Sequence, residues 1–221
     1  AADELGMSVF PGIGMYAWFD FTPESLDWHC RTAREVWKRY GHHRSFYGWY
    51  ISEEVFGDLN RGTKTPEEIV AFFRGFGKLR DELDPTLPVL LAPNCFGVTS
   101  ALGSWKLLAR ELDILCPFGF NRMPEEDLAP EQAIALMQSI ADEGGAHLWL
   151  DMEIFLFKDD MALYPRPADE IFHELENCRN FEKVLCYQFP GLLNAPGSRL
   201  TPGGPETVKL YCDYRRRIHA D

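Results

Sequence analysis

The sequence has no long apolar run and no excess of positive charge, and each absence excludes a class of protein. Its longest apolar stretches, near residues 88–93 and 147–157, fall well short of the roughly 20 residues that a membrane-spanning helix needs. Acidic residues outnumber basic ones by 34 to 22, and the formal net charge of −12 disfavours contact with a nucleic-acid backbone or an anionic membrane. We therefore expect neither a nucleic-acid partner nor membrane association.

Common cofactor motifs are also missing. The six cysteines have irregular spacing and form no C-x-x-C pair, so they indicate neither a disulfide framework nor a zinc site. The nearest approach to a dinucleotide-binding turn, residues 11–14, leads into an aromatic segment and not into a helix. No histidine closes a predicted strand, and Lys183 starts its strand, on the wrong rim for Schiff-base chemistry. We expect no cofactor and no metal.

Apolar, strand-like runs alternate six times with amphipathic, helix-like runs, without a linker between them, and this pattern predicts repeated βα units in one domain over residues 1–221. Proline at the first helical position marks five helix starts. The predicted strands are Met7–Ile13, Ser45–Ser52, Pro88–Pro93, Leu112–Phe118, His147–Phe155 and Lys183–Phe189, and the helix starts are Pro23, Pro66, Pro130, Pro167 and Pro205.

Strands that are apolar on both faces predict a parallel sheet covered on both sides, and repeats of roughly 35 residues favour a TIM (β/α) barrel over a doubly wound sheet. Six units are two fewer than a closed barrel has. We expect a partial barrel that lacks the first two βα units, with its open sheet edges covered by a preceding segment, by oligomerisation or by altered packing.

In a barrel the polar residues at the carboxyl ends of the strands form the site. Two strands carry carboxylates there, and we expect Glu54 and Glu153 to act as a catalytic pair, with Glu53 as the rival of Glu54. Aromatic side chains at the same rim would stack on sugar rings. The expected substrate contacts are Tyr16, Trp18, Trp49, Tyr50, Glu53, Asn94, Asn121, Asp151 and Gln188.

A purely structural reading of the same residues stays open. Glu53 and Glu54 also suit the first turn of a loop or helix, and Asp151 and Glu153 also suit buried ion pairs with an arginine. About half of the aromatic residues are expected to be core.

The run from Tyr40 to Glu54, YGHHRSFYGWYISEE, resembles a segment of domain of unknown function 4434, a bacterial barrel family grouped with the glycoside hydrolases. Similar matches occur around Leu5–Gly12, Leu91–Pro93, Asp151–Phe155 and Tyr187–Phe189. The resemblance implies a TIM barrel in which Glu54 ends strand four and Glu153 ends strand seven, with Glu54 as general acid/base and Glu153 as nucleophile of a retaining glycosidase. Export to the periplasm or medium would fit it, although localisation stays open because the first residues show no signal-peptide pattern.

Two positions depart from the pattern of that glycosidase group. Glu53 stands where asparagine usually precedes the acid/base, and Pro117-Phe118-Gly119 stands where Pro-Gln-Asp is frequent. We therefore carry three hypotheses: a retaining glycoside hydrolase acting on a carbohydrate, a carbohydrate-binding barrel without catalysis, and a metal-dependent sugar isomerase or lyase.

Overall fold

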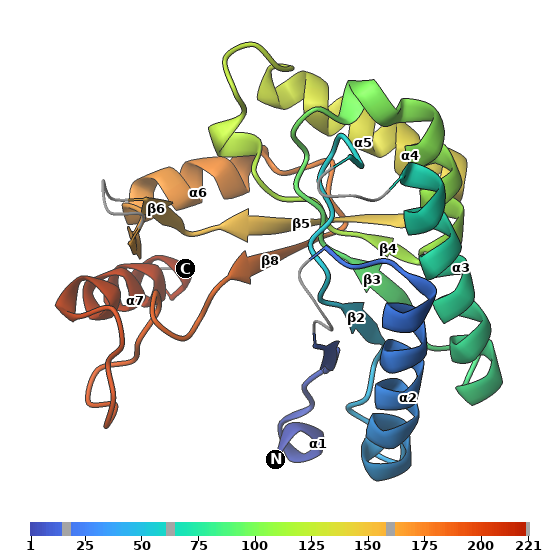
Figure 1. The fold of residues 1–221 in the computed structure, drawn as a ribbon. Helices are drawn as coiled ribbons and strands as arrows, with labels where there is room; N and C mark the ends of the chain where they lie inside the picture. Colours follow the sequence, from blue (N-terminus) through green and yellow to red (C-terminus); the bar gives the residue numbers. More distant parts are fainter. Residues whose placement is uncertain (15–18, 61–64, 158–161, 220–221) are drawn as a thin grey trace. The chain divides into compact units, whose positions relative to one another are not determined.

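A computed structural model describes residues 1–14, 19–60, 65–157 and 162–219, and strands and helices alternate along them (Figure 1). The chain divides into two compact units, Ala1–Trp149 and Leu150–Asp221. Strand β5 (His147–Glu153) begins in the first unit and ends in the second.

Among its described residues, the first unit holds four further strands and five helices. The strands are β1 (Gly12–Ile13), β2 (Trp49–Ile51), β3 (Val89–Leu91) and β4 (Ile114–Leu115), and the helices are α1 (Ala2–Leu5), α2 (Pro23–Tyr40), α3 (Pro66–Leu83), α4 (Leu102–Leu108) and α5 (Pro130–Gly144). Three short 3₁₀ turns complete it, namely η1 (Val98–Ala101), η2 (Ala109–Glu111) and η3 (Phe120–Arg122). Helices α2, α3 and α4 lie next to one another in chain order beside the strands (Figure 1).

The second unit contains the end of β5 and five further elements. They are β6 (Phe155–Phe157), β7 (Leu163–Pro165), α6 (Ala168–Asn177), β8 (Lys183–Tyr187) and α7 (Pro205–Ile218). Strands β6 and β7 form an antiparallel hairpin. The sequence predicted one strand over His147–Phe155, which is wrong at its end: the Ile154 N–H donates to Tyr187 on β8 while its carbonyl accepts from Arg166, so the chain leaves the sheet there and enters the hairpin.

The strand order of the main sheet is β1-β2-β3-β4-β5-β8, which follows the order of the chain. Neighbouring strands from β1 to β5 pair in parallel. A doubly wound sheet reverses its order near the middle, whereas a barrel adds each strand beside the previous one. The predicted fold class, α/β with six parallel strands of a partial TIM barrel, is confirmed.

Four of the five predicted helix starts are confirmed, since Pro23, Pro66, Pro130 and Pro205 occupy the first helical position. The fifth is displaced by one residue, because Pro167 precedes the first residue of α6. Helix α3 has a complete capping box: Thr65 accepts from the N–H of Glu68, whose carboxylate accepts from the N–H of Thr65. The strands are shorter than predicted, and β1 stops short because Pro11, which has no N–H, separates it from the isolated Val9–Phe46 bridge.

Alternating residues of the first-unit strands pack into two apolar layers. On one face, which we call the inner face, Leu90, Ala92, Ile114, Cys116 and Trp149 form a buried cluster, with Phe10, Tyr50 and Phe118 packed against it. On the other face, which we call the helix face, Trp49 contacts Trp37 of α2 and Phe76 of α3. Since side chains of a strand alternate, membership of one layer predicts on which face the following residues lie.

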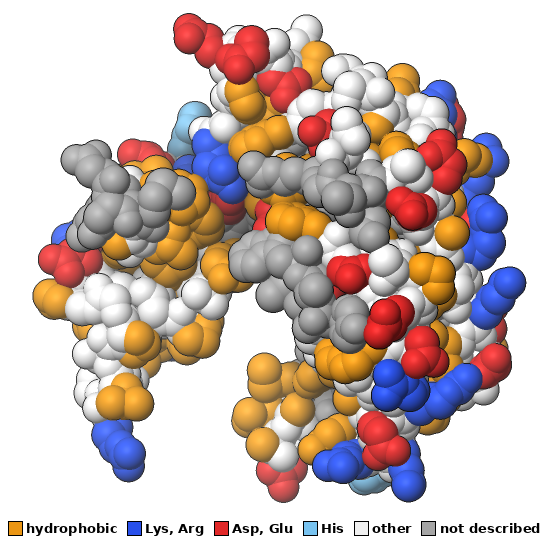
Figure 2. Space-filling model, in the orientation of Figure 1, with side chains coloured by type: hydrophobic (Ala, Val, Ile, Leu, Met, Phe, Trp, Pro, Cys, Tyr) orange, Lys and Arg blue, Asp and Glu red, His pale blue; other side chains and the backbone are white. Residues whose placement is uncertain are grey.

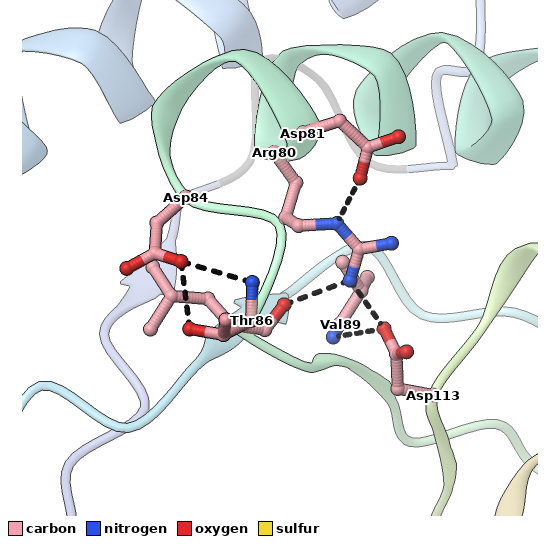
Figure 3. A network of polar contacts seen from close by, with 7 residues as sticks. Arg80, Asp81, Asp84, Thr86, Val89 and Asp113 are labelled. Carbon is pink, nitrogen blue, oxygen red and sulfur yellow. Dashed lines mark hydrogen bonds and ion pairs between the residues drawn. The ribbon is translucent and has the colours of Figure 1, made fainter.

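Arg80, near the end of α3, links that helix to the starts of β3 and β4 (Figure 3). Its Nη1 donates to the Leu87 carbonyl at 2.8 Å and to Asp113 Oδ2 at 2.7 Å, and the same Asp113 oxygen accepts from Val89 N at 2.8 Å. The guanidinium also contacts Asp81. The group sits at the amino ends of these strands, the rim of a barrel that serves stability.

Replacing Arg80 by methionine should lower the free energy of unfolding by about 2 kcal/mol, because the Leu87 carbonyl and Asp113 lose a charged donor. Urea unfolding measures this change. Lys78→Met on the same helix is the matched control, since Lys78 is exposed. An equal loss in both variants would contradict a structural role for the Arg80 contacts.

Acidic and basic side chains mix over the helices of the first unit in the face shown, without a basic patch (Figure 2). In the part of the chain that the structure describes, no helix is long and apolar enough to span a membrane. The six cysteines, all of which are among the described residues, form no disulfide with one another.

Candidate functional site

The carboxyl end of β2 separates the two adjacent glutamates. Glu53 continues the helix-facing positions of Trp49 and Ile51, and its Oε1 lies 3.6 Å from Nε2 of His29 on α2, with both side chains fully buried. Glu54 follows at a half-buried position. Strand β2 ends at Ile51 and Glu53 lies at a bend, so strand alternation does not assign a face to Glu54. Because Glu53 is buried against His29, Glu54 is the more accessible of the two, and its catalytic role stays a prediction.

His29 has a defined tautomer. Its Nδ1 lies 2.7 Å from the Ser25 carbonyl, which can only accept, so Nδ1 carries a proton. Burial lowers the pKa of His29, which favours the neutral ring, while hydrogen bonds with the Ser25 and Gly14 backbones oppose this shift.

The two aromatic residues of β2 that we expected to contact substrate lie in different layers. Trp49 has no exposed surface and packs among Trp37, Phe46 and Phe76, so it offers nothing to a ligand in this structure. Tyr50 is half-buried against the inner cluster. Of the two, only Tyr50 keeps surface on the face where the site is expected.

The asparagines of the first unit also differ. Asn94, after β3, is buried, and its Oδ1 accepts from Phe96 N at 2.8 Å, which closes a local turn. Its backbone forms a parallel bridge with Phe118. Asn121 is exposed on η3, beside Arg122, whose guanidinium lies over the Phe96 ring. Asn121 therefore has the more accessible amide.

The second unit brings Asp151 and Glu153 together at the carboxyl end of β5. The two residues alternate with Met152 and continue the positions of Trp149, which belongs to the inner cluster. Glu153 is 6% exposed and Asp151 is half-buried. The buried Arg166 donates to the backbone carbonyl of Glu153 at 2.8 Å.

The Arg166 guanidinium itself contacts Glu174 Oε2 at 2.6 Å and Glu170 at 3.8 Å, both on α6. Burial raises the pKa of Asp151 to about 6, and the neighbouring Glu153 charge adds to the shift. Asp151 therefore titrates near neutrality, as acid–base groups of active sites do.

Asp151→Asn should remove a pH dependence of stability. The pKa of Asp151 rises from 3.8 to about 6 on folding, so its stabilising contribution is present below about pH 4 and is lost as pH rises through about 6. Relative to the wild type at pH 4, the wild type at pH 7 should lose about 2 to 3 kcal/mol through this group, and the variant should not. Urea unfolding from pH 4 to 7.5 measures this, with the exposed Asp169→Asn as control. Parallel curves for wild type and Asp151→Asn would refute the raised pKa.

The remaining predicted contacts are only partly visible. Gln188 is half-buried directly after β8, and the Tyr187–Gln188 peptide bond is cis. Tyr16 and Trp18 lie outside the described residues, so their predicted contacts stay predictions. Glu54 belongs to the first unit and Glu153 to the second, so each is placed here within its own unit.

Sequence reasoning missed His29, Arg166 and Glu174. The four-residue spacing of Ser25, His29 and Ala33 marks the buried side of α2 and could have identified His29 as a core residue. Arg166 and Glu174 carried no such signal, because their contacts depend on the unpredicted hairpin. Among the residues that the structure describes, no three His, Cys, Asp or Glu side chains are grouped as a metal site.

This sequential parallel fold, with carboxylates ending β5, is a glycosidase-like TIM barrel, and solved structures share it. One is a proposed alpha-L-fucosidase from Bacteroides thetaiotaomicron VPI-5482, with a TM-score of 0.67 and 19% identity over 89% of this chain and 61% of that chain. The second is a GH18 chitinase from Pseudoalteromonas aurantia, with a TM-score of 0.56 and 14% identity over 84% of this chain and 72% of that chain. The third is a beta-glucuronidase from Bacteroides uniformis, with a TM-score of 0.57 and 17% identity over 85% of this chain and 24% of that chain. The chain thus spans less than two thirds of the length of the first of these proteins.

The family is shown by the sequence itself. Residues 1–200 match the model of DUF4434, a domain of unknown function, and the chain belongs to this family. No curated protein matches it. The resemblance expected from the Tyr40–Glu54 run is confirmed.

Proposed function

We propose that the protein is a glycoside hydrolase that cleaves O-glycosidic bonds of a carbohydrate by a retaining mechanism. Glu153 forms the glycosyl-enzyme intermediate, and Glu54 first protonates the leaving oxygen and then activates water. The observation that carries the proposal is the Asp151–Glu153 pair at the carboxyl end of β5, in a fold whose sites lie at the carboxyl ends of the strands. The glycosidase-like fold supports the reaction class.

The proposed substrate contacts come from the strand ends of each unit. Tyr50 and the exposed Tyr187 supply apolar ring faces for stacking on sugars, while the exposed Asn121 and the half-buried Gln188 supply amides. The buried Asn94 would have to move to contact substrate. Asp151, protonated below about pH 6, donates a hydrogen bond to a sugar hydroxyl or to Glu153. A neutral glycan suits the net charge of −12 better than an anionic one.

A panel of aryl glycosides with good and poor leaving groups tests the acid/base assignment. Glu54→Gln should slow hydrolysis of poor leaving groups by about 10²-fold or more and slow good ones much less, because good ones need no protonation. Glu53→Gln is the matched control, since Glu53 faces His29 on α2, and its loss should not depend on the leaving group. The assignment of Glu54 as acid/base would be wrong if Glu54→Gln slowed hydrolysis of all leaving groups equally. It would also be wrong if the loss of rate in Glu53→Gln depended on the leaving group. Retained anomeric configuration in the first product, followed by NMR, tests the stereochemistry.

A carbohydrate-binding barrel without catalysis is the second candidate. It is favoured by one observation: Glu53, where the related glycosidases have an asparagine before the acid/base, lies against His29. If this candidate is right, the wild type should hydrolyse no glycoside. Calorimetry should then show that a Glu54→Gln/Glu153→Gln variant still binds glycans.

A further inference from the structure

The peptide group that joins Glu153 to Ile154 is held at both of its polar ends. Its N–H, on Ile154, donates to the carbonyl of Tyr187 on β8 at 3.2 Å. Its carbonyl, on Glu153, accepts from Nη1 of Arg166 at 2.8 Å. The next carbonyl, on Ile154, accepts from the backbone N–H of Arg166 at 3.0 Å. Arg166 therefore fixes the chain at the point where it leaves the sheet, directly after Glu153.

The orientation of this peptide group bears directly on the Glu153 side chain. The backbone turns only about two dihedral angles per residue, so rotating the peptide plane beside Glu153 redirects its carboxylate. Strand β5 holds the plane on the amino-terminal side, and Arg166 together with Tyr187 holds the plane on the other side. A reacting group has to lie about 3 to 3.5 Å from its target, and a displacement of about 1 Å can slow a reaction about 10²-fold.

Arg166 is itself held by carboxylates of α6. Its side chain is 7% exposed, and Nη1 also contacts Oε2 of Glu174 at 2.6 Å. Glu170, one turn earlier on α6, lies 3.8 Å from Nε. A buried ion pair in general adds little net stability, because taking two charges out of water costs about as much free energy as their attraction returns. Stability alone is therefore a weak reason for a buried arginine at this place.

We propose that Arg166 is a positioning residue, which holds the backbone at Glu153 so that the carboxylate points at the anomeric carbon of the substrate. The proposal rests on the proposed role of Glu153 as nucleophile. Arg166 acts through its Nη1 and its own N–H, and Glu174 orients the guanidinium from α6. All of these residues belong to the second unit.

Amide hydrogen exchange followed by NMR tests the positioning without any substrate. In Arg166→Met the Ile154 N–H should exchange at least about 10-fold faster than in the wild type, because its peptide group has lost the contact at the carbonyl. The His147 N–H, which donates to the Asp113 carbonyl at the start of β5, is the internal reference and should keep its rate. An unchanged Ile154 rate, or an equal acceleration of both amides, would overturn the proposal.

Steady-state kinetics test the consequence for catalysis. On an aryl glycoside with a poor leaving group, the kcat of Arg166→Met should fall about 10²-fold while KM changes less than about threefold. Arg166→Lys should recover at least about a tenth of the wild-type kcat, because the single nitrogen Nη1 makes both the Glu153 and the Glu174 contact and an ammonium can replace it. Arg217→Met is the matched control, since Arg217 forms exposed ion pairs with α6, and it should keep the wild-type kcat.

A double variant separates positioning from the ion pair. Removing Arg166 alone leaves the carboxylate of Glu174 without its guanidinium, which can unfold the unit, whereas Arg166→Met/Glu174→Met removes both charges together. The double variant should fold, as far-UV circular dichroism shows, and should have the same faster Ile154 exchange and the same loss of kcat as Arg166→Met.

A folded double variant with the wild-type kcat would overturn the proposal. A double variant that does not fold would also overturn it, because Arg166 and Glu174 would then hold the unit as a whole. If the wild type hydrolysed no glycoside, the proposed function would fail, and the exchange rates would still decide whether Arg166 fixes the backbone at Glu153.

Discussion

Glu153→Gln should reduce turnover of any glycoside that the wild type hydrolyses by at least about 10³-fold, the largest functional effect that we expect. The glutamine keeps the shape of the side chain but cannot form the glycosyl-enzyme bond. The fold should persist, because Arg166 binds the backbone carbonyl at this position, which the substitution keeps. Steady-state kinetics measure the turnover, and far-UV circular dichroism shows whether the fold persists.

A small nucleophile distinguishes a missing nucleophile from a disturbed site. With Glu153→Ala, azide should enter the vacated space and give a glycosyl azide of inverted configuration, since only one displacement then occurs. Glu174→Gln, which removes the Arg166 partner on α6 and leaves Glu153 in place, is the matched control and should not respond to azide. Wild-type rates in Glu153→Gln would end the nucleophile assignment, and an azide product of retained configuration would argue for a different nucleophile.

Trp49→Ala should lower the free energy of unfolding by about 3 to 5 kcal/mol, the largest stability effect that we expect. Trp49 has no exposed surface, and its ring centroid lies 4.8 Å from that of Phe46 and 6.2 Å from that of Phe76. The truncated side chain would leave a void among the rings of Trp37 on α2, Phe76 on α3 and Phe46 in the loop before β2. Urea unfolding measures the loss.

Trp49→Phe is the conservative control. Among the described residues Trp49 Nε1 has no hydrogen-bond partner, so phenylalanine removes volume but no hydrogen bond, and about 1 to 2 kcal/mol is expected. Tyr50→Ala, on the inner face, should lower the free energy of unfolding less than Trp49→Ala does. It should weaken glycan binding more than Trp49→Ala does. If Trp49→Ala were as stable as the wild type but bound no glycan, Trp49 would be a substrate contact, as the sequence predicted.

Much of the fold was predictable because its signals are local. Proline at helix starts, the Thr65–Glu68 capping box and apolar runs of strand length act over a few residues, and the structure confirms them within one to a few positions. The β6–β7 hairpin was not predictable in this way. It depends on Ile154 bonding to Tyr187 and Arg166, which are distant in the chain.

The candidate site was predictable only as a set of residue types at strand ends. In an extended strand, neighbouring residues such as Trp49 and Tyr50, or Glu53 and Glu54, face opposite sides of the sheet. The sequence pattern does not say which member of each pair faces the helices, because both faces of these strands are apolar. The α2 helix resolves it by bringing His29 to Glu53. The raised pKa of Asp151 likewise needed its burial, which no neighbour in the sequence reveals.

The sequence by itself determined the alternation of strands and helices, the parallel sheet, the acidic surface and the position of carboxylates at strand ends, because each follows from local propensity or from composition. Only the tertiary structure decided which glutamate after β2 faces the helices and that Trp49 is core. These depend on which helix covers which face of a strand, and that is settled by packing between segments far apart in the chain.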